Sequence, residues 1–293
     1  MFHVVHFESV DELETALRRE SYLADEGLAV AVHLALAMRR PLLLEGEPGV
    51  GKTEVAKTLA RILDVELIRL QCYEGIDSGQ ALYEWDYSRQ LLYARALQGG
   101  EIDAAARVHE LFGPEFLLER PLLRAVRSGA GAVLLVDELD RADDEFEAFL
   151  LEVLSDFQVT IPEVGTIRAE TPPAVVITSN RTRELHDALK RRCLFHWIDY
   201  PDLEREIEII RLRADGVDEE LARSVAEAIA RIRTMDLLKL PGPAEAIDWA
   251  RALALLAVRR VDEMSARQTL GWAVKNRDDL RMVESVIGEI VGG

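Results

Sequence analysis

The chain has 293 residues, which is enough for one large or two moderate domains, and we expect two. Its 53 acidic residues outnumber its 35 basic ones, and the net charge of -18 argues against a broad surface for nucleic-acid phosphates. The two cysteines, Cys72 and Cys193, lack the spacing of a metal site and are predicted to be free thiols in a reducing compartment.

No stretch of the sequence is typical of a targeting signal or of a membrane span. Residues 1–6 contain no basic region that leads into a long apolar core. The longest apolar stretches, residues 28–38 and 252–258, are interrupted or too short to cross a bilayer. We therefore expect a cytoplasmic protein without a membrane span.

Two helices are predicted before the first strand. Ser9 and Glu12 have the spacing of a capping box, which opens a helix through residues 13–19. From Glu26 to Met38 apolar residues recur at helical spacing and predict the second helix. Neither helix carries residues that are typical of catalysis.

A complete phosphate-loop motif follows the first predicted strand, Pro41 to Leu44. Gly46 to Thr53 matches G-x-x-x-x-G-K-[ST] at every position and precedes a helical run, Glu54 to Leu63. The glycines let several N–H groups converge on phosphate oxygens, and the helix adds the positive end of its dipole. The alternative is an ordinary glycine-rich turn, which the flanking strand and helix disfavour.

The motif assigns roles to particular residues. Lys52 is expected to reach the β- and γ-phosphates of ATP, and the Thr53 hydroxyl is expected to bind Mg²⁺. The predicted nucleotide-binding residues are Glu47, Pro48, Gly49, Val50, Gly51, Lys52, Thr53 and Glu54. The region before the first strand is a candidate wall for the adenine base, without an assignment of residues.

The next strand is predicted from Glu66 to Gln71, and a long stretch separates it from the strand that follows. Because the stretch is long for a plain crossover between parallel strands, it predicts an insertion, with helices at Ile102 to Leu111 and Pro121 to Val126. Trp85 and Tyr87 are interpreted as core or interface packing rather than as platforms for base stacking, because their neighbours are acidic.

Ala132 to Asp137 predicts a buried parallel strand that ends in two carboxylates, Asp137 and Glu138. They come at the carboxyl end of the strand, the edge where ligands bind in open α/β sheets. Asp137 is expected to hold Mg²⁺, directly or through water, and Glu138 to act as general base on the attacking water. Alone, an apolar run that ends in Asp-Glu is often a strand leaving the core, but after a complete phosphate loop it indicates an ATPase site.

A helix from Glu145 to Ser155 and a hairpin from Gln158 to Arg168 are predicted next. They lead to an apolar strand, Ala174 to Thr178. Asn180 follows this strand, where a polar side chain is placed to orient water beside the γ-phosphate. The alternative is that Asn180 only caps the helix after it.

A basic cluster, Lys190 to Arg192, lies between a short helix at residues 185–189 and the last strand, Cys193 to Ile198. The cluster is either a solvated patch or the place where a ring-forming ATPase presents an arginine to its neighbour's γ-phosphate. Arg192 is the first choice for this trans-acting arginine, and Arg191 is the second.

From Asp202 onward the sequence is helical, with short connections that are typical of a small bundle. The predicted helices are Leu203 to Arg213, Glu219 to Arg233, Ala244 to Val258, and one or two more between Ser265 and Ile290.

These motifs together carry a family resemblance. The phosphate loop, Val133 to Glu138, Asn180 and Arg192 resemble, in order, the Walker A, Walker B, sensor 1 and arginine-finger motifs of AAA+ ATPases. The resemblance implies an α/β fold: a P-loop αβα core with a parallel sheet at residues 1–200, and a small all-α lid at residues 201–293.

Further features narrow the resemblance to the MoxR family. Glu138 to Ala142 is similar to the family signature D-E-[IL]-[ND]-R-A, and the insertion and the hairpin resemble its helix-2 insert and the hairpin before sensor 1. Glu45 to Glu54, Leu70 to Gly75 and Leu189 to Cys193 resemble the CoxD-like branch. Members of that branch are associated with maturation of molybdenum-containing carbon monoxide dehydrogenases.

The resemblance implies a chaperone-like ATPase that uses ATP and Mg²⁺ to remodel a metalloenzyme client. It also implies a homo-oligomer, most often a hexameric ring, and a partner protein with a von Willebrand factor A domain. A DNA-directed AAA+ machine is an alternative, although the net charge of -18 disfavours it. A nucleotide-dependent regulatory switch is another.

One position departs from the family pattern. Many MoxR relatives have Ser-Pro-Arg at the start of the third lid helix, with the arginine as sensor 2, but Pro243-Ala244-Glu245 stands there. A carboxylate cannot stabilise the γ-phosphate. Either Arg251, about two turns further on, substitutes, or the ATPase works without this contact and hydrolysis is slow.

Overall fold

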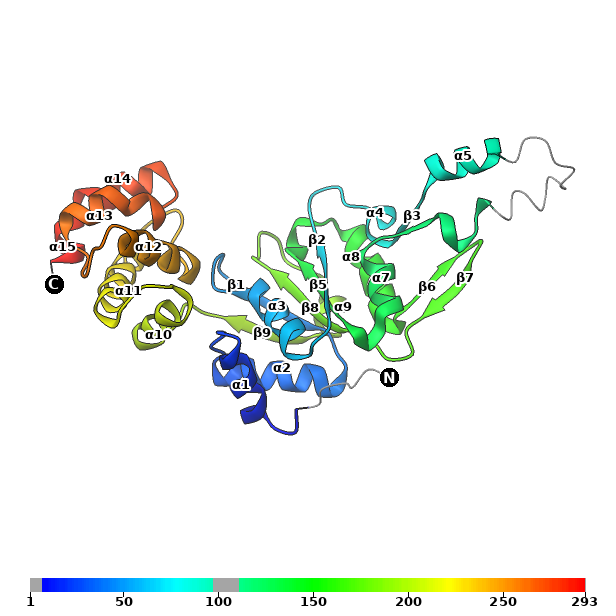
Figure 1. Cartoon of the computed structure of the whole chain (residues 1–293), viewed down its shortest axis with the longest axis horizontal. Coiled ribbons are helices and arrows are strands. Elements are labelled where there is room, and N and C mark those ends of the chain that lie inside the picture. The colour runs from blue at the N-terminus through cyan, green and yellow to red at the C-terminus, as the bar shows by residue number, and fades with distance from the viewer. Residues whose placement is uncertain (1–6, 97–110, 293) are drawn as a thin grey trace, which may run out of the picture. The chain divides into compact units, whose positions relative to one another are not determined.

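The computed structural model describes residues 7–96 and 111–292, and Figure 1 labels its elements. Up to the last strand they are α1 (Val10–Arg19), α2 (Glu26–Met38), β1 (Leu42–Gly46), α3 (Lys52–Ile62), β2 (Glu66–Gln71), α4 (Ser78–Leu82), β3 (Tyr83–Trp85), α5 (Tyr87–Ala96), β4 (Leu117–Glu119), α7 (Pro121–Ser128), β5 (Ala132–Asp137), α8 (Asp144–Asp156), β6 (Gln158–Ile161), β7 (Gly165–Arg168), β8 (Ala174–Ser179), α9 (Asp187–Lys190) and β9 (Leu194–Ile198). The helices that follow are α10 (Leu203–Arg213), α11 (Glu219–Arg233), α12 (Pro243–Leu255), α13 (Glu263–Thr269), α14 (Arg277–Ser285) and α15 (Ile287–Val291). Two predictions, on a signal at residues 1–6 and on a helix at 102–111, fall outside the described residues, apart from residue 111.

The chain divides into two compact units, and each is described by itself. The sheet unit consists of Met1–Leu13, Glu26–Glu45 and Val55–His196. The helical unit consists of Glu14–Asp25, Gly46–Glu54 and Trp197–Gly293. The predicted boundary between residues 200 and 201 stays a prediction.

A five-stranded sheet with the order β2-β5-β8-β1-β9 organises the fold. β2 pairs with β5, β5 with β8, and β8 with β1, all in parallel. Parallel neighbours cannot be joined by a two-residue turn, so the connections between these strands are long crossovers that include helices. The prediction of an α/β phosphate-loop fold with a parallel sheet, followed by helices, is confirmed.

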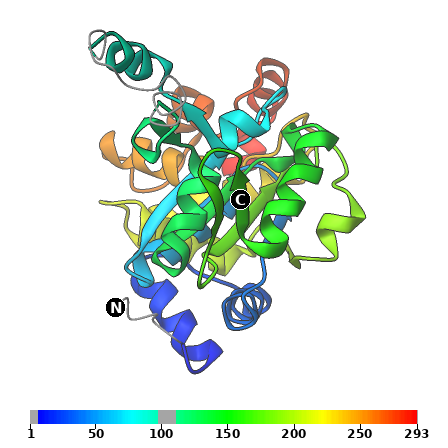
Figure 2. The same ribbon diagram turned by 90° about the vertical axis from the view of Figure 1, so that its right-hand side faces the viewer.

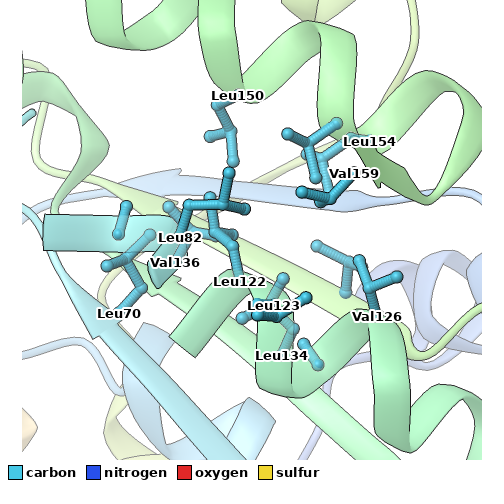
Figure 3. Packing of buried hydrophobic residues seen from close by; sticks show 14 of the residues in the cluster. Leu70, Leu82, Leu122, Leu123, Val126, Leu134, Val136, Leu150, Leu154 and Val159 are labelled. Carbon is cyan, nitrogen blue, oxygen red and sulfur yellow. The ribbon is translucent and has the colours of Figure 1, made fainter. Parts of the chain in front are cut away.

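The central strand β5 is buried along its whole length, as its unbroken apolar run predicts. Leu134 and Val136 of this strand belong to the largest apolar cluster of the sheet unit, together with residues of α7 and α8. Figure 3 shows Leu122 and Leu123 of α7 among these side chains. Helices therefore cover this face of the sheet and fix the carboxyl end of β5, where its two carboxylates lie.

The insertion after β2 forms a small subdomain in which α5 stands clear of the central sheet, as Figures 1 and 2 both show. Trp85 is buried and makes edge contacts with Tyr83 and Phe112, so its prediction as a packing residue is confirmed. Tyr87 begins α5 and is 65% exposed, so it is not a core residue, and the interface alternative of its prediction stays a prediction.

The helical unit has its own core around Trp249 of α12, which is fully buried. The indole N–H of Trp249 donates to the Thr269 hydroxyl at 2.7 Å, so its polar atom is satisfied. Asp202 and Asp218 cap α10 and α11, as their position before each helix predicts. Three helices rather than one or two fill the stretch after α12, because Asn276 caps a new helix there and Val286 interrupts the chain again.

Both cysteines are free and buried, as predicted. Burial raises the pKa of the Cys72 thiol to about 12, and the carboxylates of Asp137 and Asp140 add to this shift. Burial likewise raises the pKa of the Cys193 thiol to about 12. The thiolate, which is the reactive form, is therefore scarce at pH 8.

We expect neither cysteine to react with an aromatic disulfide reagent at pH 8 while the protein is folded. In denaturant, both should react within the mixing time of the assay, since the thiol pKa returns to its ordinary value. Absorbance of the released thiol measures both states. A fast-reacting thiol in the folded protein would contradict the burial described for these residues.

Within the described residues, no helix is both long enough and apolar enough to cross a membrane.

Candidate nucleotide site

The phosphate loop, residues 46–53, joins β1 to α3 and belongs to the helical unit. Gly49 has φ +84°, a left-handed conformation, and a Cβ there would lie 2.9 Å from Oε2 of Glu245. A Cβ on Gly46 would clash with the carbonyl oxygen of Ile198. Because only glycine fits these two positions, the motif's glycines are required by the loop itself and not only by a ligand.

The Lys52 side chain lies inside this loop. Its ammonium group donates to the carbonyl oxygens of Gly46, at 2.7 Å, and of Glu47, at 2.8 Å, and the residue is only 6% exposed. Thr53 follows in the first turn of α3 and is half-buried. Its carbonyl partners hold the ammonium group inside the loop, where the motif predicts phosphate oxygens.

The first turn of α12 packs directly on the loop. A Cβ on Gly242 would lie 3.0 Å from the Pro48 carbonyl oxygen, and the Ala244 N–H donates to the Gly49 carbonyl oxygen at 3.4 Å. The Glu245 carboxylate accepts the Gly242 N–H at 3.0 Å and so caps α12. The place expected for sensor 2 therefore holds a carboxylate that faces the loop.

Arg251, the predicted substitute for sensor 2, donates to the carbonyl oxygen of Arg213 at 2.5 Å. Arg213 itself extends from α10 to the start of α3, where it pairs with Glu54 at 3.2 Å. Arg213 could not be predicted from the sequence, because it ends a helix far along the chain from the loop. Whether Arg251 acts as sensor 2 stays a prediction.

The segment between α1 and α2 lies beside the loop. The Tyr22 ring lies 3.8 Å from the position that a Cβ on Gly51 would take. Tyr22 is buried, and this burial raises the pKa of its hydroxyl well above the ordinary value. Arg205 of α10 donates to the Leu23 carbonyl oxygen at 2.9 Å and holds this segment against the helices. Tyr22 is thus an aromatic neighbour of the loop in the region predicted as an adenine wall.

In the sheet unit, Asp137 ends β5 and is 2% exposed. Its Oδ1 accepts the Thr178 hydroxyl of β8 at 2.6 Å. Its Oδ2 accepts two N–H groups of Arg69, from Nε at 3.0 Å and from Nη2 at 2.5 Å. The buried carboxylate is therefore neutralised by a guanidinium from the neighbouring strand β2, a partner that sequence reasoning did not identify.

Glu138 follows in the left-handed conformation, with φ 55° and ψ 51°. For a residue with a Cβ this conformation costs on the order of 1–3 kcal/mol. It is held because the Glu138 N–H donates to the Thr178 hydroxyl at 2.9 Å. The carboxylate then accepts N–H groups from Gln71 at 3.1 Å and from Asn180 at 3.4 Å, and it pairs with Arg141 at 3.2 Å.

Asp140 fixes the chain that carries Asn180. This buried carboxylate accepts the backbone N–H of Asn180 at 3.1 Å and both the N–H and the hydroxyl of Thr182, at 2.9 and 2.7 Å. Asn180 does not cap a helix, because α9 begins only at Asp187. The structure thus brings Asp137, Glu138 and Asn180 together at the carboxyl ends of β5 and β8.

Mg²⁺ prefers oxygen ligands, and two predicted residues supply them. The Asp137 carboxylate of the sheet unit and the Thr53 hydroxyl of the helical unit both offer oxygen, and the Asp137 carboxylate is at present paired with the Arg69 guanidinium.

The two candidate trans-acting arginines lie at the other end of the strands. Arg191 and Arg192 are exposed and stand between α9 and the start of β9. A guanidinium N–H of Arg192 donates to the Leu151 carbonyl oxygen of α8 at 3.3 Å. Within the sheet unit they are therefore separate from Glu138 and Asn180.

Comparison with known protein families shows which family the chain matches. Residues 41–193, more than half of the chain, match the AAA domain of the dynein-related subfamily. This stretch includes the phosphate loop, the carboxylates after β5, Asn180 and both arginines.

The three similar proteins that follow are distant in sequence. An uncharacterized protein of Staphylococcus epidermidis is 25% identical over 205 residues, which cover 68% of this chain and 70% of that protein. The gas vesicle ATPase GvpN of Haloferax mediterranei is 24% identical over 238 residues, which cover 78% of this chain and 62% of GvpN. A solved structure of Thermotoga maritima RuvB aligns with a TM-score of 0.51 at 19% identity, covering 99% of this chain and 82% of that one, and shows a shared fold.

Proposed function

The chain belongs to the dynein-related subfamily of AAA domains, and on this basis we propose that it binds ATP with Mg²⁺ and hydrolyses it. The observation that carries the proposal is the cluster of Asp137, Glu138 and Asn180 at the carboxyl ends of neighbouring strands. A complete phosphate loop follows β1, the next strand of the same sheet. In open parallel sheets this edge is where ligands bind.

In the proposed reaction, water attacks the γ-phosphate of ATP, and ADP leaves as phosphate forms. Lys52 and the N–H groups of the loop hold the phosphates, while Asn180 orients the water and Glu138 accepts its proton. Bound Mg²⁺, held by Thr53 and Asp137, would supply positive charge to the β- and γ-phosphate oxygens. Most of the acceleration in this chemistry comes from positioning and charge stabilisation.

The site is proposed to be completed by a second subunit. AAA+ proteins commonly form rings, so we propose a homo-oligomer, most simply a hexameric ring. Arg192 of one copy would reach the γ-phosphate bound by the next copy, with Arg191 as the second choice. Isolated subunits are then expected to hydrolyse ATP slowly.

Replacing Arg192 by Ala should lower kcat by about 10³-fold, because an arginine supplied in trans stabilises the charge of the transition state. ATP affinity should stay near the wild-type value, since the residue contacts the nucleotide of another copy. Steady-state phosphate release and a fluorescent ATP analogue measure the two quantities. A normal rate for the Arg192 variant together with a slow Arg191→Ala variant would transfer the role to Arg191.

We further propose that hydrolysis drives chaperone-like maturation of a molybdenum-containing metalloenzyme of the carbon monoxide dehydrogenase type. The support is the similarity of Glu138 to Ala142 to the MoxR signature and of Leu70 to Gly75 to the CoxD-like branch. The same resemblance supports a partner with a von Willebrand factor A domain. A site of action in the cytoplasm is part of the same proposal.

The test of this client is a deletion strain of a host that makes such an enzyme. The client protein should accumulate inactive, and the wild-type gene should restore its activity, whereas a Glu138→Gln gene should not. Full client activity in the deletion strain would contradict the assignment. A DNA-directed machine predicts instead that duplex DNA stimulates ATP hydrolysis, and a regulatory switch predicts tight ATP binding without turnover.

A further inference from the structure

The Arg69 guanidinium of β2 takes up one oxygen of the Asp137 carboxylate. Asp137 Oδ2 accepts N–H groups from both Nε and Nη2 of Arg69, at 3.0 and 2.5 Å. Because one carboxylate oxygen has about two lone-pair sites, Arg69 uses both sites of Oδ2. The other oxygen, Oδ1, accepts the Thr178 hydroxyl at 2.6 Å. The guanidinium therefore lies on a carboxylate that is also a predicted ligand of Mg²⁺.

The two members of this ion pair differ in their freedom to move. The Asp137 side chain is 3% exposed, whereas that of Arg69 is 50% exposed. β2 is the first strand in the order β2-β5-β8-β1-β9, so β5 is its one neighbour among the strands that the structure describes. Nη2 of Arg69 also donates to the side-chain oxygen of Gln71, on the same face of β2. The core fixes the carboxylate, but the guanidinium can turn toward solvent from this edge of the sheet.

Negative charge is concentrated where β5 ends. Asp137 and Asp140 are both buried, and Glu138 lies beside them in the chain. A buried carboxylate is costly unless a cation or hydrogen-bond donors compensate its charge. Asp140 is compensated by backbone N–H groups and a hydroxyl, and Glu138 pairs with Arg141. For Asp137 the compensating cation is Arg69.

Asp137 can be compensated by Mg²⁺ in the same way as by Arg69. Both cations need the oxygens of this carboxylate, and two cations so close repel each other strongly where burial reduces screening by solvent. They are therefore alternatives at Asp137 and not joint partners. A chain in which Arg69 holds this carboxylate is not competent to bind the metal ion there, and the apparent affinity for the ion falls in proportion.

We infer that Arg69 sets the affinity of the ATPase site for its divalent cation, because the guanidinium competes for Asp137 and must turn away before this carboxylate holds a metal ion. The inference rests on the proposed ATPase function and adds one residue to it. Arg69 acts through Asp137, so it is a positioning residue and not a catalytic one. Its removal is expected to strengthen metal binding, whereas the removal of a residue that only supports the fold would weaken it.

The test measures the binding of Mn²⁺, which prefers oxygen ligands as Mg²⁺ does and is detected by electron paramagnetic resonance. Full-length chains are titrated with Mn²⁺ in the presence of a hydrolysis-resistant ATP analogue, so turnover does not enter the measurement. Arg69→Gln should bind Mn²⁺ at least about tenfold more tightly than wild type, because the competing charge is gone. Arg69→Lys should lie between the two, since an ammonium keeps the charge but lacks the planar pair of donors.

Arg124→Gln is the matched control. Arg124 of α7 is 55% exposed and pairs with Glu66 of β2, a carboxylate that is itself 42% exposed. An exposed pair of this kind contributes little, so the Mn²⁺ affinity of this variant should stay within about twofold of wild type.

The double variant Arg69→Gln/Asp137→Asn shows whether the gain in affinity depends on Asp137. Asp137→Asn alone should bind Mn²⁺ more weakly than wild type, because a neutral amide replaces the charged ligand. The double variant should show none of the gain of Arg69→Gln, since residues in contact are not additive in their effects. A gain that persists without the Asp137 carboxylate would overturn the inference.

The unfolding temperature gives a readout that does not depend on spectroscopy of the ion. Without a divalent cation, Arg69→Gln should unfold at a lower temperature than wild type, because a buried pair has lost one partner. Mn²⁺ with the ATP analogue should then raise the unfolding temperature by more in Arg69→Gln than in wild type, since tighter binding stabilises the folded state more. If Arg69→Gln does not fold, the same comparison is made with Arg69→Lys.

Two results separate the possible failures. Mn²⁺ affinities of Arg69→Gln and Arg69→Lys that are equal to or below that of wild type would overturn the inference and leave the ATPase proposal intact. A wild-type chain that binds neither the ATP analogue nor Mn²⁺ together with it would overturn the proposed function, and the inference with it.

Discussion

Glu138→Gln is expected to bind ATP and to hydrolyse it about 10²- to 10⁴-fold more slowly than wild type, the range that a general base contributes. Glutamine keeps the size and hydrogen-bonding shape of glutamate but cannot accept a proton from water. The backbone of residue 138 is held by the Thr178 hydroxyl and not by its own side chain, so the exchange should leave the loop in place. The loss should therefore appear in kcat and not in ATP affinity.

Phosphate release measures the rate, and a fluorescent ATP analogue measures affinity. Glu145→Gln, which changes an exposed carboxylate in the first turn of α8, is the matched control and should behave as wild type. Retained turnover in Glu138→Gln would remove this residue from the role of base. Loss of ATP binding would show instead that its contacts with Gln71 and Asn180 support the site as a whole.

Lys52→Ala is expected to weaken ATP binding by about 10²-fold. A hydrogen bond to a charged group contributes about 1.5–3 kcal/mol, and each 1.4 kcal/mol corresponds to a factor of ten in affinity. The ammonium also donates to two carbonyl oxygens of the loop, which would be left without it. The loop that holds the phosphates would then lose part of its own structure.

Isothermal titration with ATP and Mg²⁺ measures this loss. Lys57→Ala, an exposed lysine on the same helix α3, is the matched control and should keep the wild-type affinity. Unchanged ATP affinity in Lys52→Ala would contradict the assignment of residues 46–53 as the phosphate site. The unfolding temperature of both variants, measured without nucleotide, separates a damaged fold from a lost contact.

The sequence predicted the sheet closely because its strong signals are local. The unbroken apolar run of β5 specifies a strand that is buried on both faces, and the fixed spacing of the phosphate loop specifies a strand, a turn and a helix. The bounds of α2 and β2 match their predictions because apolar periodicity and flanking turn residues determine them within one segment.

Contacts between residues that lie far apart in the sequence could not be predicted from these local patterns. Arg69 lies on β2, and only the pairing of β2 with β5 brings it to Asp137. In the sequence Asp140 is only another acidic residue in a turn. The structure shows that its carboxylate accepts the backbone N–H of Asn180, which follows β8. The exposure of Tyr87 also depends on what covers α5, which no local pattern encodes.

Glu245 stands where the family pattern has an arginine, and the structure assigns this residue a local role. The sequence indicates only that an expected arginine is missing from the start of α12. The structure adds that Glu245 caps this helix and faces Gly49, so the residue has a local structural role. A carboxylate so near the phosphate loop repels bound phosphate. Slow hydrolysis stays a prediction.

The measurement that tests the central claim most directly follows ATP turnover and oligomeric mass together as protein concentration rises, with and without duplex DNA. The account predicts that turnover per chain increases as oligomers assemble and is the same with DNA as without it. A monomer that binds ATP and stays inactive at every concentration, or an activity that depends on DNA, would contradict it.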